Sequence, residues 1–357
     1  MIVAETLEPR PARVHAFDTA RGCAVVLVVF MHVTERLQLE APLSAGLTLF
    51  NWSAASIRMP LLFMLSGVLA NGYLTRGLQD VGRRSTHFVW LLFVWGVVAT
   101  MVSLIGSPAP AAFSSQIRSI LLPDSPLWFI WALAMFTAVI PFVARRPRAQ
   151  IVGIALVISC LSYLPSIRDM LPDVPVLKTA RHGVYFYVGL TYARSIVDFT
   201  VGRSARSIAL LVGATLVLHA ANGITDRWLH LSLLLIPEKF TLSILALALA
   251  ASLPQTRLAL GLQWLGRNTL PIFLGHMLFV DYLVRWPIGI GQLERSAVIT
   301  LCSVIASLGL KKCIDSAGLG WMYRMPTAIA TSGAFTAPDG HRTRKIPGIL
   351  ARARDAI

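Results

Sequence analysis

The stretch FDTARGCAVVLVVFMHV, residues 17–33, decides the class of this protein. Its apolar run is followed by others of roughly 15 to 23 residues, the length of a helix that crosses a bilayer. Of the 357 residues, 55% are apolar and 14% are charged, whereas a soluble domain has about 25% charged residues. We therefore expect an all-α fold, a polytopic membrane helix bundle with lipid as its solvent.

The apolar runs predict about ten transmembrane helices. The short connections between them carry most of the bases, and one set of connections holds roughly twice as many as the opposite set, which places both termini in the cytoplasm by the positive-inside rule. The first run lacks a cleavage site and is expected to stay as the first span. The expected spans are 20–35, 53–72, 87–106, 126–144, 150–165, 181–198, 207–222, 229–252, 266–284 and 295–311.

Three segments follow from this pattern: a cytoplasmic amino-terminal segment (1–19), the membrane domain (20–311) and a basic cytoplasmic tail (312–357). The tail carries HRTRKIPGILARAR (341–354) near its end, and its composition predicts disorder or a loosely attached surface helix. Lipid binding is one interpretation of its charge, and a solvated basic tail is the simpler one. The net charge of +15 is explained by topology, so no nucleic-acid partner is expected. The four cysteines show no CxxC spacing, and no metal site is predicted.

The first span carries two polar residues on one face. Arg21 and His32 are eleven positions apart, which is three helical turns plus about 20°, and they lie about 16 Å apart along the axis. Asp18 can pair with Arg21, and Glu35 can orient the imidazole of His32. The alternative interpretation is that Arg21 is a positive-inside anchor and His32 an interhelical hydrogen-bonding residue.

Two more ionisable residues reach the depth of His32 in other spans. Arg58 lies in the second span and His276 in the ninth, and each is a functional candidate because burying such groups in lipid is costly. A snorkelling role is the alternative for Arg58. Ser66 is a further pocket candidate, although Ser66-Gly67 is more typical of close helix packing than of a nucleophile.

Two further polar or aromatic features are candidates for a pocket. Glu238 and Lys239 follow Pro237 in an apolar run, where they face a wet cavity at a helix break or else satisfy each other. Trp128 is a pocket candidate whose simpler explanation is an interfacial aromatic anchor. The sequence contains no GxSxG, Walker, GxGxxG or HExxH motif, so neither a soluble hydrolase nor an ATP-driven protein is indicated.

Four stretches together resemble a known family: FDTARGCAVVLVVFMHV (17–33), RMPLLFMLSGVLA (58–70), SPLWFIWALAMF (125–136) and WLGRNTLPIFLGHMLFV (264–280). They are similar to the bacterial integral-membrane acyltransferases called type three, near the branch of the fucose 4-O-acetylases. The resemblance runs from about Asp18 to about Leu310. It implies an enzyme of the cytoplasmic (inner) membrane that moves an acyl group, most simply acetyl, from acyl-CoA to a hydroxyl of a sugar or another envelope molecule.

The resemblance also implies roles for individual residues. His32 becomes the candidate catalytic base and Arg21 its partner, with Arg58 and His276 in the pocket. A histidine suits proton removal from a hydroxyl, and an arginine such as Arg58 can stabilise the charge that develops on the thioester oxygen. The acyl-CoA phosphates are expected on basic residues of the cytoplasmic side, chiefly Arg76, Arg83 and Arg84.

The expected partners are the acyl-CoA co-substrate, a carbohydrate or lipid-linked acceptor and membrane lipid, with no permanently bound cofactor. Two other classes stay open. Polar residues at mid-membrane and a broken helix also fit a transporter or flippase of an envelope glycolipid, and a non-catalytic membrane partner or sensor would not need His32.

Overall fold

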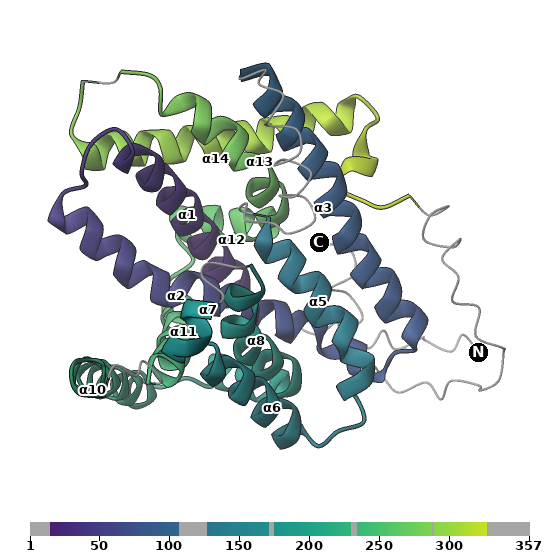
Figure 1. Cartoon of the computed structure of the whole chain (residues 1–357), viewed down its shortest axis with the longest axis vertical. Helices are drawn as coiled ribbons and strands as arrows, with labels where there is room; N and C mark the ends of the chain where they lie inside the picture. The colour runs from purple at the N-terminus through teal and green to yellow at the C-terminus, as the bar shows by residue number, and fades with distance from the viewer. Residues whose placement is uncertain (1–14, 107–126, 171–174, 230–233, 288, 327–357) are drawn as a thin grey trace, which may run out of the picture.

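The computed structural model describes residues 15–106, 127–170, 175–229, 234–287 and 289–326. In these ranges the chain is helical and contains no strand (Figure 1). The fold is the expected all-α helix bundle. Its α-helices are α1 (His15–Gln38), α2 (Ala45–Ala70), α3 (Leu78–Gly106), α5 (Trp128–Val143), α6 (Arg148–Leu161), α7 (Pro165–Met170), α8 (Pro175–Thr191), α9 (Ala193–Val201), α10 (Ala205–Leu229), α11 (Leu235–Ser252), α12 (Arg257–Arg267), α13 (Thr269–Leu283) and α14 (Gln292–Ser316).

Many of these helices suit a bilayer. Among the described residues, six are long and apolar enough to cross it: α1, α2, α3, α10, α11 and α14. Shorter apolar helices are α5, α6 and α13. Large apolar side chains such as Phe93, Phe142, Leu216 and Leu301 remain exposed on their outer faces, which is the surface that lipid would cover. The protein is a multi-pass membrane protein.

Glycines let the central helices approach closely. A side chain at Gly67 would overlap the backbone of Phe186, and one at Gly189 would overlap Met64, so α2 and α8 cross at small residues. In the same way Gly22 meets the backbone of Leu262 on α12. Ser66-Gly67 is therefore a packing point, as the sequence indicated, and the crossings fix α1 and α2 within the core.

The periphery contrasts with this core. Helix α10 lies at the edge of the bundle beside α11 (Figure 1), and none of the residues in its most apolar window is buried. Such an apolar exposed helix is stable in lipid because its backbone hydrogen bonds are internal. His32, His276 and Arg58, which are described below, lie on α1, α13 and α2 and not on this helix.

Two expected segments differ in the structure. The span at 181–198 is not one helix, because α8 ends at Thr191 and α9 begins at Ala193. Helix α9 is amphipathic, with Ile196 buried and Arg194 exposed, so it suits the membrane surface. The connection before the ninth span contains α12, a short helix with a polar face that escapes a search for apolar runs.

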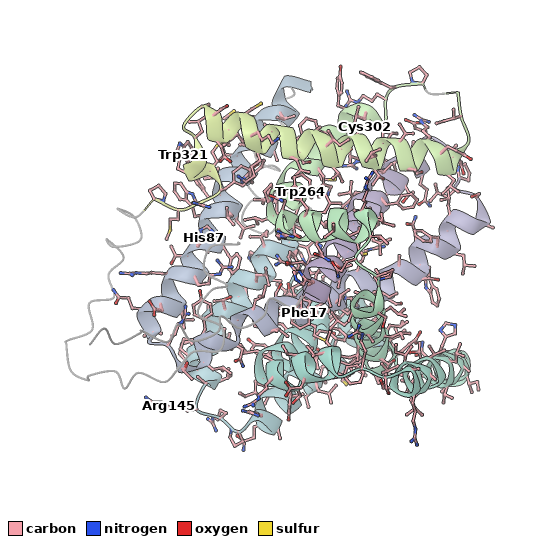
Figure 2. The ribbon with its side chains drawn as sticks, turned by 180° about the vertical axis from the view of Figure 1, so that it is seen from behind. Phe17, His87, Arg145, Trp264, Cys302 and Trp321 are labelled. Carbon is pink, nitrogen blue, oxygen red and sulfur yellow. The ribbon has the colours of Figure 1, made fainter. Side chains whose placement is uncertain are left out.

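The boundaries at both ends of the membrane domain also differ. Helix α1 begins at His15, before the expected boundary at 19/20, and α14 continues past 311 to Ser316. After α14 the chain folds back on α3, where Trp90 Nε1 donates to the carbonyl of Trp321 (2.9 Å) and the amide of Met325 donates to His87 Nδ1 (3.4 Å). Figure 2 shows His87 and Trp321 on the same side of the molecule. The first part of the predicted tail is thus anchored by hydrogen bonds, and residues 327–357 lie outside the described ranges.

Candidate active site

His32 lies in the carboxyl-terminal half of α1 and forms a pair with a carboxylate one turn later. Its Nδ1 is 3.0 Å from Oε2 of Glu35. A carboxylate can only accept, so Nδ1 of the neutral ring carries the proton and donates it, which leaves Nε2 with a free lone pair. The His32 side chain is 15% exposed, so a substrate can reach this ring. The arrangement is that of a general base oriented by an acid.

His276 on α13 faces this ring. The two imidazole centroids are 5.3 Å apart, with 31° between the planes. His276 is completely buried, and its Nδ1 lies 2.8 Å from the carbonyl of Phe273 and 3.0 Å from that of Ile272. Carbonyls only accept, so Nδ1 is the donor and Nε2 keeps a lone pair, for which the described residues provide no hydrogen-bond partner.

An ion pair holds the two histidine helices in register. Arg36 Nε on α1 is 2.6 Å from Asp281 Oδ1 on α13, one turn after His32 along α1. Both side chains are about half exposed, so the pair lies at the outer rim of the bundle. The contact joins α1 to α13 one turn beyond the two imidazoles, in addition to the apolar packing of Val29 and Val33 against Ile272 and Val280.

Arg58 on α2 completes this group of polar side chains. It is 7% exposed, its Nη2 lies 2.6 Å from Met31 Sδ, and its Nη1 lies 3.4 Å from the carbonyl of Asn51. Its Nε has no hydrogen-bond partner among the described residues. The guanidinium interacts electrostatically with Glu35. A buried cation with a spare donor beside the histidines is suited to stabilise a developing negative charge.

A cavity of about 210 Å³ opens at the other end of α1. Three arginines line it: Arg21 on α1, Arg76 after α2, and Arg84 on α3. The guanidinium of Arg84 lies 4.5 Å from the centroid of Phe88, and that of Arg76 lies 4.8 Å from Tyr73. In the part of the chain that the structure describes, no carboxylate pairs with Arg76 or Arg84. The cavity therefore offers cations to an anionic ligand.

The inner wall of the cavity is aromatic and leads toward the histidines. Phe129 on α5 and Phe273 on α13 both line it, with ring centroids 5.1 Å apart. Phe273 lies in turn 5.9 Å from the ring of His276. Phe273 therefore belongs to the cavity wall and also contacts the buried imidazole of His276.

The structure groups some of the predicted site residues and separates others. His32, His276 and Arg58 come together, and Arg21, Ser66, Arg76 and Arg84 line the cavity. Arg83 does not line it, because its side chain is exposed on the adjacent face of α3. Trp128 also lies outside the cavity wall, packed between the rings of Phe63 (5.7 Å) and His182 (5.5 Å).

Glu238 lies at a distinct place and has a partner that the sequence analysis missed. Its Oε1 is 2.9 Å from Nδ1 of His219 on α10, while Lys239 donates to the hydroxyl of Tyr163 (3.4 Å). Glu238 and Lys239 therefore do not satisfy each other within the described chain, and that interpretation was wrong. His219 itself is an ionisable residue within an apolar run, so the rule that selected His32 and His276 also selects His219.

The remaining missed residues carry no such signal. Asn51, which holds Arg58 through its carbonyl, also donates from Nδ2 to Thr34 Oγ1 at 2.8 Å. Phe129 and Phe273 are two of many apolar residues in their helices, and their place in the cavity wall follows from the packing of α5 on α13. A single sequence does not distinguish the uncharged residues of a site from the many other uncharged residues in the same apolar runs.

Comparison with known proteins agrees with this arrangement. The chain matches the family model described as an acyltransferase domain over residues 14–310, which is most of its length. Searches of curated proteins and of solved structures gave no match. The matched region begins just before α1 and ends within α14, and so includes the histidine pair, Arg58 and the arginine cavity. The chain therefore belongs to the type three acyltransferase family and is an enzyme that transfers acyl groups.

Proposed function

We propose that the protein transfers an acyl group, most simply acetyl, from cytoplasmic acyl-CoA to a hydroxyl of a sugar or another envelope molecule in the bacterial cytoplasmic membrane. The observation that carries the proposal is the arginine-lined cavity at one end of α1 and the His32–Glu35 pair about 16 Å further along the same helix. The donor would enter through the cavity, and the acceptor would meet it at His32.

The cavity suits one part of acyl-CoA. At about 210 Å³ it is smaller than the roughly 300 Å³ or more of a site that encloses a drug-sized ligand. It would therefore hold the slender thioester arm, with the phosphates outside on the arginines. Arg76 is exposed and Arg84 is partly buried, so the cations extend from the surface into the cavity. Arginine forms paired hydrogen bonds with phosphate, which a lysine cannot reproduce.

The chemistry balances with the groups present. Nε2 of His32 takes the proton of the acceptor hydroxyl while its oxygen attacks the thioester carbonyl carbon. Arg58 stabilises the negative charge that gathers on the carbonyl oxygen. The carbon–sulfur bond then breaks, and the CoA thiolate leaves and takes up a proton, which the His32 imidazolium can supply. The products are an ester and free CoA.

The experiment uses the purified full chain with radiolabelled acetyl-CoA and envelope glycan as acceptor. We expect label in the glycan, whereas a transporter or flippase would incorporate none. The double variant Arg76→Gln with Arg84→Gln should raise the KM for acetyl-CoA on the order of tenfold with a smaller change in kcat, because the cations hold the donor and not the reacting atoms.

Arg83→Gln is the matched control. It removes an arginine adjacent to Arg84 in sequence, but its side chain lies outside the cavity. We expect its KM to stay within about twofold of the wild type. If Arg83→Gln raised the KM as much as the double variant did, the cavity would not be the donor site, and the arginines would only reflect topology.

A further inference from the structure

A second cluster of cations lies on the side of the bundle that the charge pattern assigns to the cell exterior. Its centre is Tyr163, which follows α6. Arg181 on α8 lies 5.2 Å from the centroid of this ring and Lys239 on α11 lies 5.7 Å from it. Lys239 Nζ also donates to the Tyr163 hydroxyl. We call Tyr163, Arg181 and Lys239 the outer cation cluster.

The two cations have no anionic partner within the described chain. Arg181 uses Nε and Nη2 on a single acceptor, the carbonyl of Ser162, at 3.3 Å each. A guanidinium has five donor hydrogens, so this cap of α6 leaves most of its capacity unused. The nearest carboxylate in sequence, Glu238, is bonded to His219 instead. Two partly buried cations that share one tyrosine repel each other, and an anion bound between them would offset this repulsion.

The outer cation cluster connects to the aromatic wall of the cavity through a series of rings. His182 interacts electrostatically with both Arg181 and Lys239. The centroid of its ring lies 5.2 Å from that of Phe63. Phe63 contacts Phe129 at 4.7 Å, and Phe129 lines the cavity. Within the described chain, the hydrogen-bond partners of Arg181 and Lys239 are Ser162 and Tyr163 and not the His32–Glu35 pair. We therefore expect an anion bound to these cations to belong to a different unit of the acceptor from the one whose hydroxyl reacts.

We infer that the outer cation cluster binds an anionic group, phosphate or carboxylate, carried by the acceptor glycan at a different unit from the one that is acylated. This inference rests on the proposed function, because the glycan is an acceptor only if the protein acylates it. Binding of the anion itself does not depend on turnover. The acceptor would then be an acidic or phosphate-linked glycan held at two points: by its charge at Arg181 and Lys239, and by its hydroxyl at His32.

Binding can be measured by saturation-transfer nuclear magnetic resonance on the full chain in phosphatidylcholine nanodiscs. The probes are glucose 1-phosphate, glucuronic acid and neutral glucose. We expect a signal for one or both charged sugars and little for glucose. Comparison of the two charged probes shows whether phosphate or carboxylate is preferred. Equal signals for all three sugars would overturn the inference.

Variants assign the signal to the cluster. Lys239→Gln and Arg181→Gln should each weaken binding of the charged sugar on the order of tenfold. Glutamine can still donate to the Ser162 carbonyl, and Lys239→Gln leaves that cap intact. The control is Arg285→Gln, an exposed arginine with the same expected sidedness. If Arg285→Gln lost binding equally, or if the cluster variants bound normally, the assignment would be wrong.

Lipid phosphate is the other source of such an anion. Addition of phosphatidylglycerol to the nanodiscs should leave the sugar signal within about twofold. Loss of the signal would show that the cluster binds lipid phosphate, and it would overturn the inference that it binds the glycan. Failure of the proposed function looks different, because charged sugars would still bind while no label from acetyl-CoA reached any glycan.

Discussion

His32 and His276 stack on each other, yet the chain surrounds them differently. His32 is partly exposed and bonded to a carboxylate, Glu35. His276 is completely buried and bonded to carbonyls of its own helix. A positive charge that forms on His32 is stabilised by Glu35, whereas burial opposes the same charge on His276. We therefore expect His32, and not His276, to take up and release the proton during the reaction.

The difference also suggests what His276 does. Its buried Nε2 can accept a hydrogen bond, and its flat ring supports that of His32 at 5.3 Å. We expect it to position His32 and the incoming hydroxyl without taking the proton. Substitutions at the two histidines and at Glu35 separate these roles, and the size of each loss is the test.

The largest effect is expected at His32. His32→Ala should lower kcat on the order of 10² to 10⁴, which is the usual contribution of a positioned general base. His32→Gln should not restore activity, because an amide can hold a hydrogen bond but cannot take the proton. The measurement is turnover with labelled acetyl-CoA. His15→Ala, on the exposed first residue of the same helix, should behave as wild type. Near-normal turnover in a well-folded His32→Ala protein would remove His32 from the mechanism.

A smaller effect is expected at Glu35. Glu35→Gln keeps an oxygen beside His32 but removes the charge that stabilises the imidazolium. Loss of a charge-assisted hydrogen bond worth about 1.5 to 3 kcal/mol should lower kcat on the order of 10 to 10². The KM for acetyl-CoA should change little, since the cavity lies at the other end of α1. Glu294→Gln on the outer end of α14 is the control. Unchanged turnover in Glu35→Gln would mean that the carboxylate only packs against the ring.

At His276 we expect a loss of less than about tenfold in kcat. His276→Gln keeps a donor for the carbonyls of Ile272 and Phe273 but removes the ring that supports His32. Leaving buried polar groups poorly satisfied should also lower the free energy of unfolding by about 1 to 3 kcal/mol, measurable as a lower Tm. If His276→Gln lost more turnover than His32→Ala, His276 and not His32 would be the base.

The last prediction tests the orientation of the chain in the membrane and leaves its activity unchanged. The charge pattern of the sequence predicts that His32 lies toward the exterior and the arginine cavity toward the cytoplasm. Reporter fusions at Met1 and Ile357 should therefore both show cytoplasmic signals with unaltered acyl transfer, in line with ten spans. A terminal fusion that reports from outside would change the span count and the side from which each substrate enters.

Helix periodicity made the spacing on α1 predictable. Arg21 and His32 lie on one continuous helix, so their separation along its axis requires only the rise per residue, and the pairing of Glu35 with His32 requires only one turn. Periodicity gave no such guide at α8, where the apolar run continues past Thr191 although the helix ends there. Helix α12 also escaped detection because only one of its faces is buried.

The sequence by itself determined the all-α membrane class and the spacing of Arg21 and His32 along one helix, because these depend on composition and on the local geometry of a helix. Its four motif stretches indicated the family. Tertiary structure alone decided which residues share a site. Arg84 reaches the cavity while Arg83 points away, and Lys239 joins Arg181 on Tyr163 while Glu238 turns to His219. Adjacent residues on a helix point about 100° apart, so which of them meets a partner depends on how the helices pack. That packing is fixed by contacts between distant segments, such as Gly67 on α2 against Phe186 on α8.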